Sequence, residues 1–148
     1  MKKLICLILV LTTAICCLSS CEFLEKILGS MEKKAEAPAK IDEMMTAIAE
    51  NNVAAAIALL HPDVAQGAES GFERLCEYVD GRTVTEKKLQ GISIDTRTEF
   101  GSSVTEREEQ LTYKLTMNDG EVIELSVVYV SNEDGSGFYS FQISFGTE

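Results

Sequence analysis

The stretch LTYKLTMNDGEVIELSVVY, residues 111–129, contains two runs in which apolar and polar side chains alternate. A period of two is typical of β-strands that bury one face. Asn118-Asp119-Gly120 separates the runs and predicts a hairpin. A three-residue loop there pairs Leu115 with Ile123 and keeps one face apolar. A two-residue turn would instead pair Leu115 with Glu124, a charge among apolar side chains, so we predict the longer loop with Gly120 in the left-handed conformation.

Alternation continues on both sides of this hairpin. Downstream, residues 139–145 are apolar at every second position, and we predict a loop over residues 131–137 before them. That loop pairs Tyr129 with Tyr139 and Val127 with Phe141. Upstream, residues 84–100 indicate one earlier strand, in which Ile92 and Ile94 share a face. The sequence therefore predicts a single antiparallel sheet of about four strands with one apolar face.

The opposite face of this sheet is mostly polar, but three valines interrupt it. They are Val122, Val128 and Val130. Partly exposed valines occur on monomeric proteins and need no partner, but the strip also fits a second copy of the chain. A homodimer through this face is one expectation.

Before the strands, apolar residues follow the i, i+3, i+4 spacing of amphipathic helices. We predict a first helix from Ile41, a second over residues 53–60 and a third that Ser70 caps, with Glu73 as its capping-box partner and Gly81 at its end. Helices followed by antiparallel strands predict an α+β fold, with N-terminal helices packed on the sheet.

The helical region also carries a resemblance to a known family. The sequences IDEMMTAIAENN and AAAIALLHPD, within residues 41–63, resemble the opening of nuclear-transport-factor-2-like domains, which belong to the cystatin-like group. The resemblance implies that residues 41–148 form one domain whose curved sheet surrounds a cone-shaped cavity. This superfamily includes isomerases, cyclases and dehydratases as well as non-catalytic binding domains, so the fold does not fix the function.

The N-terminus predicts a bacterial secretory signal over residues 1–20. Two lysines precede an apolar run that is too short to span a bilayer, and the run ends in Leu18-Ser19-Ser20-Cys21. This ending resembles a lipobox, which implies that Cys21 carries lipid and becomes the first residue. We therefore expect a lipoprotein in the cell envelope. It would be anchored through Cys21 to the outer face of the plasma membrane, or to the outer membrane of a cell that has one. Residues 21–40 are predicted to be a tether and linker.

The net charge and the remaining cysteine limit the function further. The formal charge of −11 argues against nucleic-acid binding, which needs basic patches. Once the signal and the lipidated Cys21 are set aside, only Cys76 remains, so an internal disulfide is excluded. Its helical context predicts a buried thiol.

Candidate functional residues are few. His61 and Asp63 are the only helix-side pair that a small isomerase or dehydratase would use, although a His-Pro-Asp sequence is also a common helix exit. Tyr113, Tyr129 and Tyr139 would point inward and either line a ligand pocket or fill the core. We expect no metal, because the lone histidine has no cysteine or second histidine near it, and no cofactor, because the sequence has no Gly-rich phosphate loop. The expected function is non-catalytic binding of a small ligand or an envelope protein, and the alternative is the small enzyme.

Overall fold

The computed structural model describes residues 26–32, 34–98 and 105–145. The chain divides into one unit that ends at Lys34 and a second that begins at Ala35. In the first unit, residues 26–32 are helical, where we had predicted a tether. Cys21, Phe100 and the signal lie outside the described residues. All further structure belongs to the second unit.

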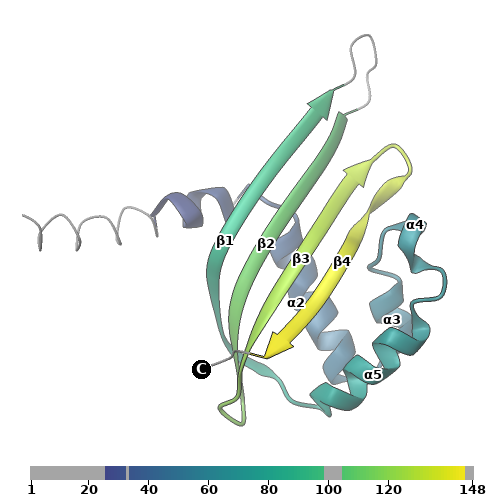
Figure 1. Cartoon of the computed structure of the whole chain (residues 1–148), viewed down its shortest axis with the longest axis vertical. Coiled ribbons are helices and arrows are strands. Elements are labelled where there is room, and N and C mark those ends of the chain that lie inside the picture. Colours follow the sequence, from purple (N-terminus) through teal and green to yellow (C-terminus); the bar gives the residue numbers. More distant parts are fainter. Residues whose placement is uncertain (1–25, 33, 99–104, 146–148) are drawn as a thin grey trace, which may run out of the picture. The chain divides into compact units, whose positions relative to one another are not determined.

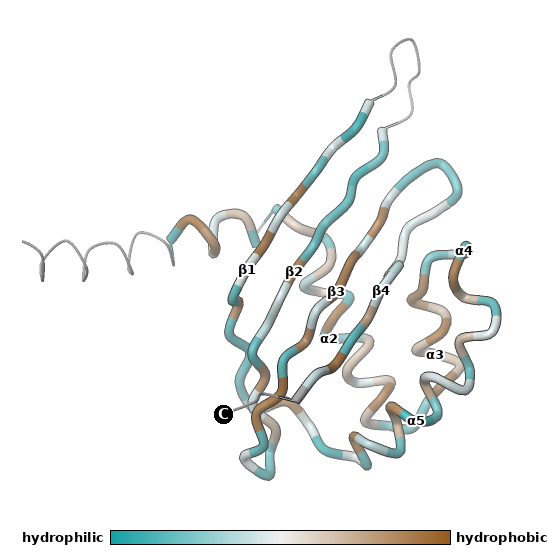
Figure 2. The backbone as a smooth tube through the Cα atoms, in the orientation of Figure 1, coloured by the Kyte–Doolittle hydropathy of each residue, from teal (hydrophilic) through white to brown (hydrophobic). Residues whose placement is uncertain are grey.

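Four strands form one open antiparallel sheet in the order β1-β2-β3-β4 (Figure 1). Their bounds are Val84–Thr98 for β1, Thr105–Met117 for β2, Val122–Asn132 for β3 and Gly135–Phe145 for β4. Figure 2 shows apolar and polar residues alternating along these strands. The predicted α+β class and the four-stranded antiparallel sheet are both confirmed.

Four helices precede the sheet in this unit. They are α2 (Ala37–Ala49), α3 (Val53–Ile57), α4 (Pro62–Ala65) and α5 (Glu69–Val79). Helix α2 begins before the predicted start at Ile41, because Pro38 lies in its first turn, where a missing N–H costs nothing. Residues 37–40, predicted as linker, are therefore the first turn of the domain.

The other helix boundaries differ from prediction at two points. Ser70 was expected to cap the third helix, but it lies inside α5, which begins without a side-chain cap. Helix α3 ends at Ile57 instead of continuing to Leu60, because Leu60 pairs with β4. The predicted end of α5 is nearly correct: Asp80 is its left-handed C-cap, and Gly81 follows with a positive φ of 73°.

The first hairpin has the predicted register. Leu115 pairs with Ile123 and Tyr113 with Leu125, while Gly120 takes a φ of 89°. The second hairpin does not. Strand β3 continues to Asn132 and β4 begins at Gly135, so a two-residue turn replaces the predicted loop over residues 131–137.

A register shift after Val128 then changes which side chains of β4 point inward. Val127 pairs with Phe141, as predicted, but Tyr129 pairs with Phe138 instead of Tyr139. Such a bulge inserts one residue into a strand, so the side chains beyond it exchange faces. Phe138 is consequently buried in the core, whereas Tyr139 is exposed.

The core lies between the helices and one face of the sheet. The helices contribute residues such as Ile41, Met44 and Ile48, and the strands contribute Leu111, Leu115 and Leu125. All six side chains are essentially inaccessible to solvent. Cys76 is also buried, as predicted, and burial raises the pKa of its thiol.

One charged residue shares the inward face of β2. Glu109 is 1% exposed, and its carboxylate accepts hydrogen bonds from the backbone N–H groups of Glu36 (2.9 Å) and Ala37 (2.9 Å) at the start of α2. Arg107 donates to the same carboxylate at 2.7 Å. A helix N-terminus has unsatisfied N–H groups and a partial positive charge, so a carboxylate there is stabilising. Glu109 therefore caps α2 from the sheet.

Arg82 joins the far end of the helical layer to the first hairpin. Its guanidinium donates to the carbonyl groups of Tyr78 (2.6 Å) and Val79 (3.0 Å) at the end of α5. It also pairs with Asp119 (3.0 Å) and with Glu121 in the β2–β3 loop region. These two carboxylates raise the pKa of the Arg82 guanidinium, and Glu121 has the larger effect. The end of α5 is thereby tied to the sheet.

The free edge of β4 is covered by residues 59–61. The Phe138 N–H donates to the carbonyl of Leu59 (2.9 Å), and the His61 N–H donates to the carbonyl of Phe138 (3.0 Å). This short parallel pairing brings the two backbones together at Gly137. A Cβ at position 137 would lie 2.4 Å from the His61 nitrogen, so only glycine fits there.

Replacing Glu109 should destabilise the domain. We expect Glu109→Ala to lower the free energy of unfolding by about 2–4 kcal/mol, because it leaves N–H groups at the start of α2 unsatisfied and removes the carboxylate that Arg107 contacts. Urea unfolding measures the change. Glu108→Ala, next in the strand but on the outer face, is the control and should cost less than about 1 kcal/mol. Equal losses in the two variants would contradict the capping role.

Gly137→Ala should cost about 1–3 kcal/mol, because the added methyl group forces the backbones of β4 and residues 59–61 apart. Gly91→Ala is the matched control in β1, since a Cβ there has no neighbour within 4 Å. Hydrogen exchange of the Phe138 and His61 amides would locate the effect. Unchanged protection of these amides in Gly137→Ala would refute the close approach.

Candidate functional site

The structure brings His61 and Asp63 together, as the sequence suggested. His61 is the N-cap of α4 and is completely buried, and its Nδ1 lies 3.4 Å from Oδ2 of Asp63. The Asp63 backbone N–H donates to Nδ1 at 3.3 Å. On the other side of the ring, Nε2 lies 3.1 Å from Oδ1 of Asn132.

These contacts engage both nitrogens of the ring. Nδ1 accepts from the Asp63 N–H, and Nε2 is within hydrogen-bond distance of Asn132. The same Asn132 oxygen also accepts from the backbone N–H of Asp134 (3.0 Å) in the β3–β4 turn. A buried imidazole with both nitrogens engaged has no atom to offer a substrate. The His61 ring therefore connects the start of α4 to the β3–β4 turn.

The structural role of His61 predicts a loss of stability on substitution. His61→Ala should cost about 2–4 kcal/mol, because it removes a buried ring and its contact with the Asn132 side chain. Asp63→Asn, at a largely exposed side chain, should change stability by less than about 0.5 kcal/mol. Chemical unfolding of the two variants tests this. If His61→Ala were as stable as the unchanged protein, the ring would not be a structural connection.

The three tyrosines do not share a pocket. Tyr113 and Tyr129 point inward as predicted and are buried among core side chains. Tyr129 packs edge-on against Phe138 with ring centroids 5.3 Å apart, and Lys87 lies 5.5 Å from the ring of Tyr113. Tyr139 was predicted to point inward, and this was wrong: it is 50% exposed, because the β-bulge turns it to the outer side.

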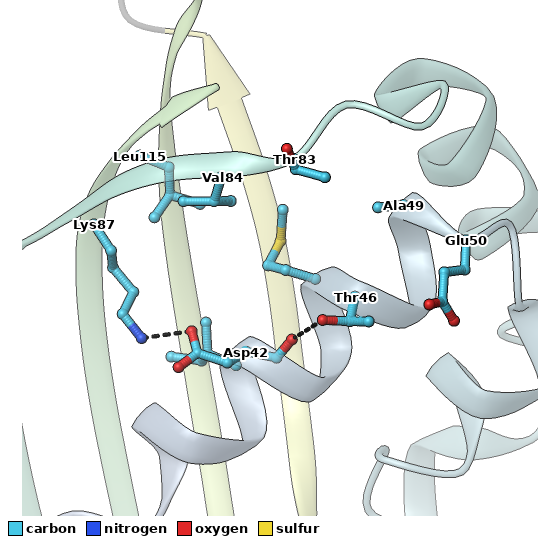
Figure 3. A pocket seen from close by; sticks show the side chains of 10 residues that line it. Asp42, Thr46, Ala49, Glu50, Thr83, Val84, Lys87 and Leu115 are labelled. Atoms are coloured by element: carbon cyan, nitrogen blue, oxygen red, sulfur yellow. Dashed lines mark hydrogen bonds and ion pairs between the residues drawn. The ribbon is translucent and has the colours of Figure 1, made fainter. Parts of the chain in front are cut away.

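One pocket lies between α2 and the start of β1 (Figure 3). Its volume is about 330 Å³, and it is lined by Ile41, Asp42, Met45, Thr46, Ala49, Glu50, Thr83, Val84, Lys87 and Leu115. Lys87 Nζ is 2.6 Å from Oδ1 of Asp42, and the Thr46 hydroxyl donates to the Asp42 carbonyl at 2.8 Å. Three of its polar side chains are thus already engaged in contacts within the protein.

A second pocket lies between α5 and β4. It has a volume of about 450 Å³ and is lined by Ala68, Gly71, Phe72, Arg74, Leu75, Tyr78, Phe141 and Ile143. Helix α5 packs mainly on α2 and α3 and makes few contacts with β4, which leaves this space open. We call it the α5–β4 pocket. It combines aliphatic and aromatic walls with one cationic side chain.

The sequence analysis missed this pocket, although a signal for it was present. The helical spacing predicts Phe72, Leu75, Cys76 and Val79 as the apolar face of α5, and all of these except Leu75 are buried. Leu75 also belongs to a second stripe, which consists of Ala68, Gly71, Leu75 and Tyr78 at i, i+3, i+7 and i+10. An apolar surface wider than one core-facing stripe indicates that α5 has a second apolar neighbour or a pocket.

The outer face of the sheet contains a depression whose lining is mainly polar. Its volume is about 500 Å³, and it is lined mainly by uncharged polar side chains, among them Gln110, Thr112, Ser126 and Gln142. The predicted valine strip is wrong in one member, because Val130 is only 8% exposed. The homodimer stays a prediction.

The described part of the chain has neither a cluster of metal-binding side chains nor a helix that could span a membrane. Within residues 26–32, 34–98 and 105–145, no three His, Cys, Asp or Glu side chains gather as a metal site requires. In the same residues, no helix has both the length and the apolar character needed to cross a bilayer. The sequence matches no known protein-family model, and no curated protein matches it with significant similarity.

Proposed function

We propose that this protein is a lipid-anchored domain of the bacterial cell envelope that binds a small apolar ligand without transforming it. The α5–β4 pocket carries the proposal. Its volume of about 450 Å³ falls within the roughly 300–1,000 Å³ of small-molecule sites. Phe72, Leu75 and Phe141 also contact the hydrophobic core, so the floor of the pocket is fixed in place before a ligand arrives.

The lining of the pocket supports binding rather than catalysis. Arg74 and Tyr78 are the only lining residues with ionisable side chains, and neither is a ready proton acceptor. An arginine stays protonated, and burial raises the pKa of the Tyr78 phenol, so that hydroxyl keeps its proton near neutral pH. An isomerase or dehydratase needs a general base in contact with its substrate. We therefore place the small-enzyme alternative second.

The proposed location rests on the N-terminal sequence. Leu18-Ser19-Ser20-Cys21 resembles a lipobox, and lipidation of Cys21 would hold the domain at a membrane surface. A domain at that position would exchange apolar molecules with the bilayer beside it. This setting suits an apolar pocket better than a pocket built for a charged metabolite.

We also propose that the domain is nuclear-transport-factor-2-like, with a curved sheet and a cone-shaped interior. The element order supports this assignment, since helices α2, α3 and α5 precede a four-stranded antiparallel sheet. That superfamily includes non-catalytic binding domains, which is consistent with the proposed function.

Gly71 offers a direct test. A Cβ there would have no neighbour within 4 Å, so a leucine can fill the pocket and also favour the helix. Residues 22–148 retain the whole described core, which begins at Ala37, and can be used without lipid. We expect this chain to bind the neutral fluorescent probe N-phenyl-1-naphthylamine. Gly71→Leu should weaken binding by about tenfold or more.

Ser70→Leu is the matched control for this experiment. It adds the same side chain to the preceding position of α5, which does not line the pocket. Fluorescence titration should give the unchanged affinity for Ser70→Leu. Equal binding by Gly71→Leu and the unchanged chain would place the probe elsewhere and overturn the proposed pocket.

A further inference from the structure

Arg74 differs from the other arginines of this chain. The sequence contains four, and three of them pair with carboxylates: Arg82 with Asp119 (3.0 Å), Arg97 with Asp95 (3.3 Å) and Arg107 with Glu109 (2.7 Å). Among the described residues, Arg74 has no such ion pair. Its Nε donates to the backbone carbonyl of Ser70 at 3.2 Å.

This arginine lines the α5–β4 pocket and is exposed to solvent. The hydrogen bond to Ser70 occupies Nε and leaves the two terminal nitrogens of the guanidinium for another acceptor. Those nitrogens form a planar pair that matches a carboxylate or phosphate with two parallel hydrogen bonds. The remaining lining is almost entirely apolar. The pocket thus has an apolar interior and a single cationic group.

Arg74 lies in an acidic chain, and two acidic residues are close to it in sequence. Glu73 and Glu77 lie near Arg74 in α5, yet neither forms an ion pair with it among the described contacts. Both glutamates are exposed, where water and salt screen their charges. Arg74 is therefore the charged group that the pocket presents, and its charge is complementary to a ligand that carries a negative charge.

We propose that the α5–β4 pocket binds an anionic amphiphile, that is, an acyl or alkyl chain with a carboxylate or phosphate head. The apolar chain would lie along Phe72, Leu75 and Ile143, and Arg74 would bind the head group. This inference rests on the proposed binding function and specifies the class of ligand. It gives Arg74 a role in selecting the ligand that the apolar walls alone cannot provide.

Four single-chain compounds with different heads on an alkyl chain of eleven or twelve carbons test the proposal. They are dodecanoate, dodecyl phosphate, dodecanol and dodecyltrimethylammonium. Each would compete with N-phenyl-1-naphthylamine for residues 22–148 at pH 8, below its micelle concentration. We expect at least one of the two anions to bind about tenfold more tightly than dodecanol, because it gains charge-assisted hydrogen bonds. The tighter anion identifies the head group, and the cation should bind most weakly.

Arg74→Gln should abolish this discrimination, so that the anions and dodecanol compete equally. Arg74→Lys should keep part of it, because the charge remains but the planar pair of nitrogens does not. Arg97→Gln, at an exposed arginine of β1 outside the pocket, should leave the preference unchanged. Urea unfolding of each variant confirms that the fold is intact.

The outcomes separate the inference from the function on which it rests. If dodecanol competes as well as both anions, and Gly71→Leu still blocks it, the pocket binds apolar ligands and the anionic preference is wrong. If the anions are preferred equally in Arg74→Gln, Arg74 does not select them and the inference fails. If no compound displaces the probe and Gly71→Leu has no effect, the proposed function fails as well.

Discussion

The architecture depends on a buried carboxylate that connects its two layers. Glu109 lies on the inward face of β2, and it accepts the N–H groups of Glu36 and Ala37, which no residue within α2 can satisfy. This capping fixes where α2 begins and how it lies on the sheet. The positions of α3 and α5 follow, because both pack on α2. Arg82 ties the end of α5 to the first hairpin, and Lys87 of β1 pairs with Asp42 of α2, so the helical layer is held to the sheet by charge at three separate places.

Side-chain periodicity predicted the parts of this fold that depend on burial alone. The first hairpin was correct, because only one register of Leu115 and Ile123 keeps charges off the inner face. The second hairpin was not, because a bulge is a backbone irregularity that alternation does not record. It exchanges Phe138 for Tyr139 and so changes one candidate site residue. Glu109 was missed for a related reason: its position continues the inward series of β2, but a charge there reads as a break in the pattern.

The candidate site likewise contains local features that the sequence predicts and contacts between distant residues that it does not. His61 and Asp63 lie together, as two residues of one helix exit, but no pattern near them predicts that Asn132, far along the chain, contacts the other ring nitrogen. The α5–β4 pocket is a result of helix packing. Helix α5 packs on α2 and α3 but makes few contacts with β4, and the pocket lies between α5 and β4. A sequence pattern shows which side chains are apolar. It does not show whether an apolar helix face packs against another element or lines an open pocket. Arg74 becomes a candidate ligand-binding residue only because this packing places it in the lining of the pocket.

The pairing of residues 59–61 with β4 also limits how copies of this protein can associate through their sheets. An open sheet has two edges, and an exposed edge is a template for another strand. Among the described residues, the cover of the β4 edge pairs with it only at Phe138, and Gly137 is what permits the two backbones to approach so closely there. The β1 edge has no such pairing along its described length. A second copy that added a strand to this sheet would meet a blocked segment on β4 but none on β1, so association by strand addition should take place at β1.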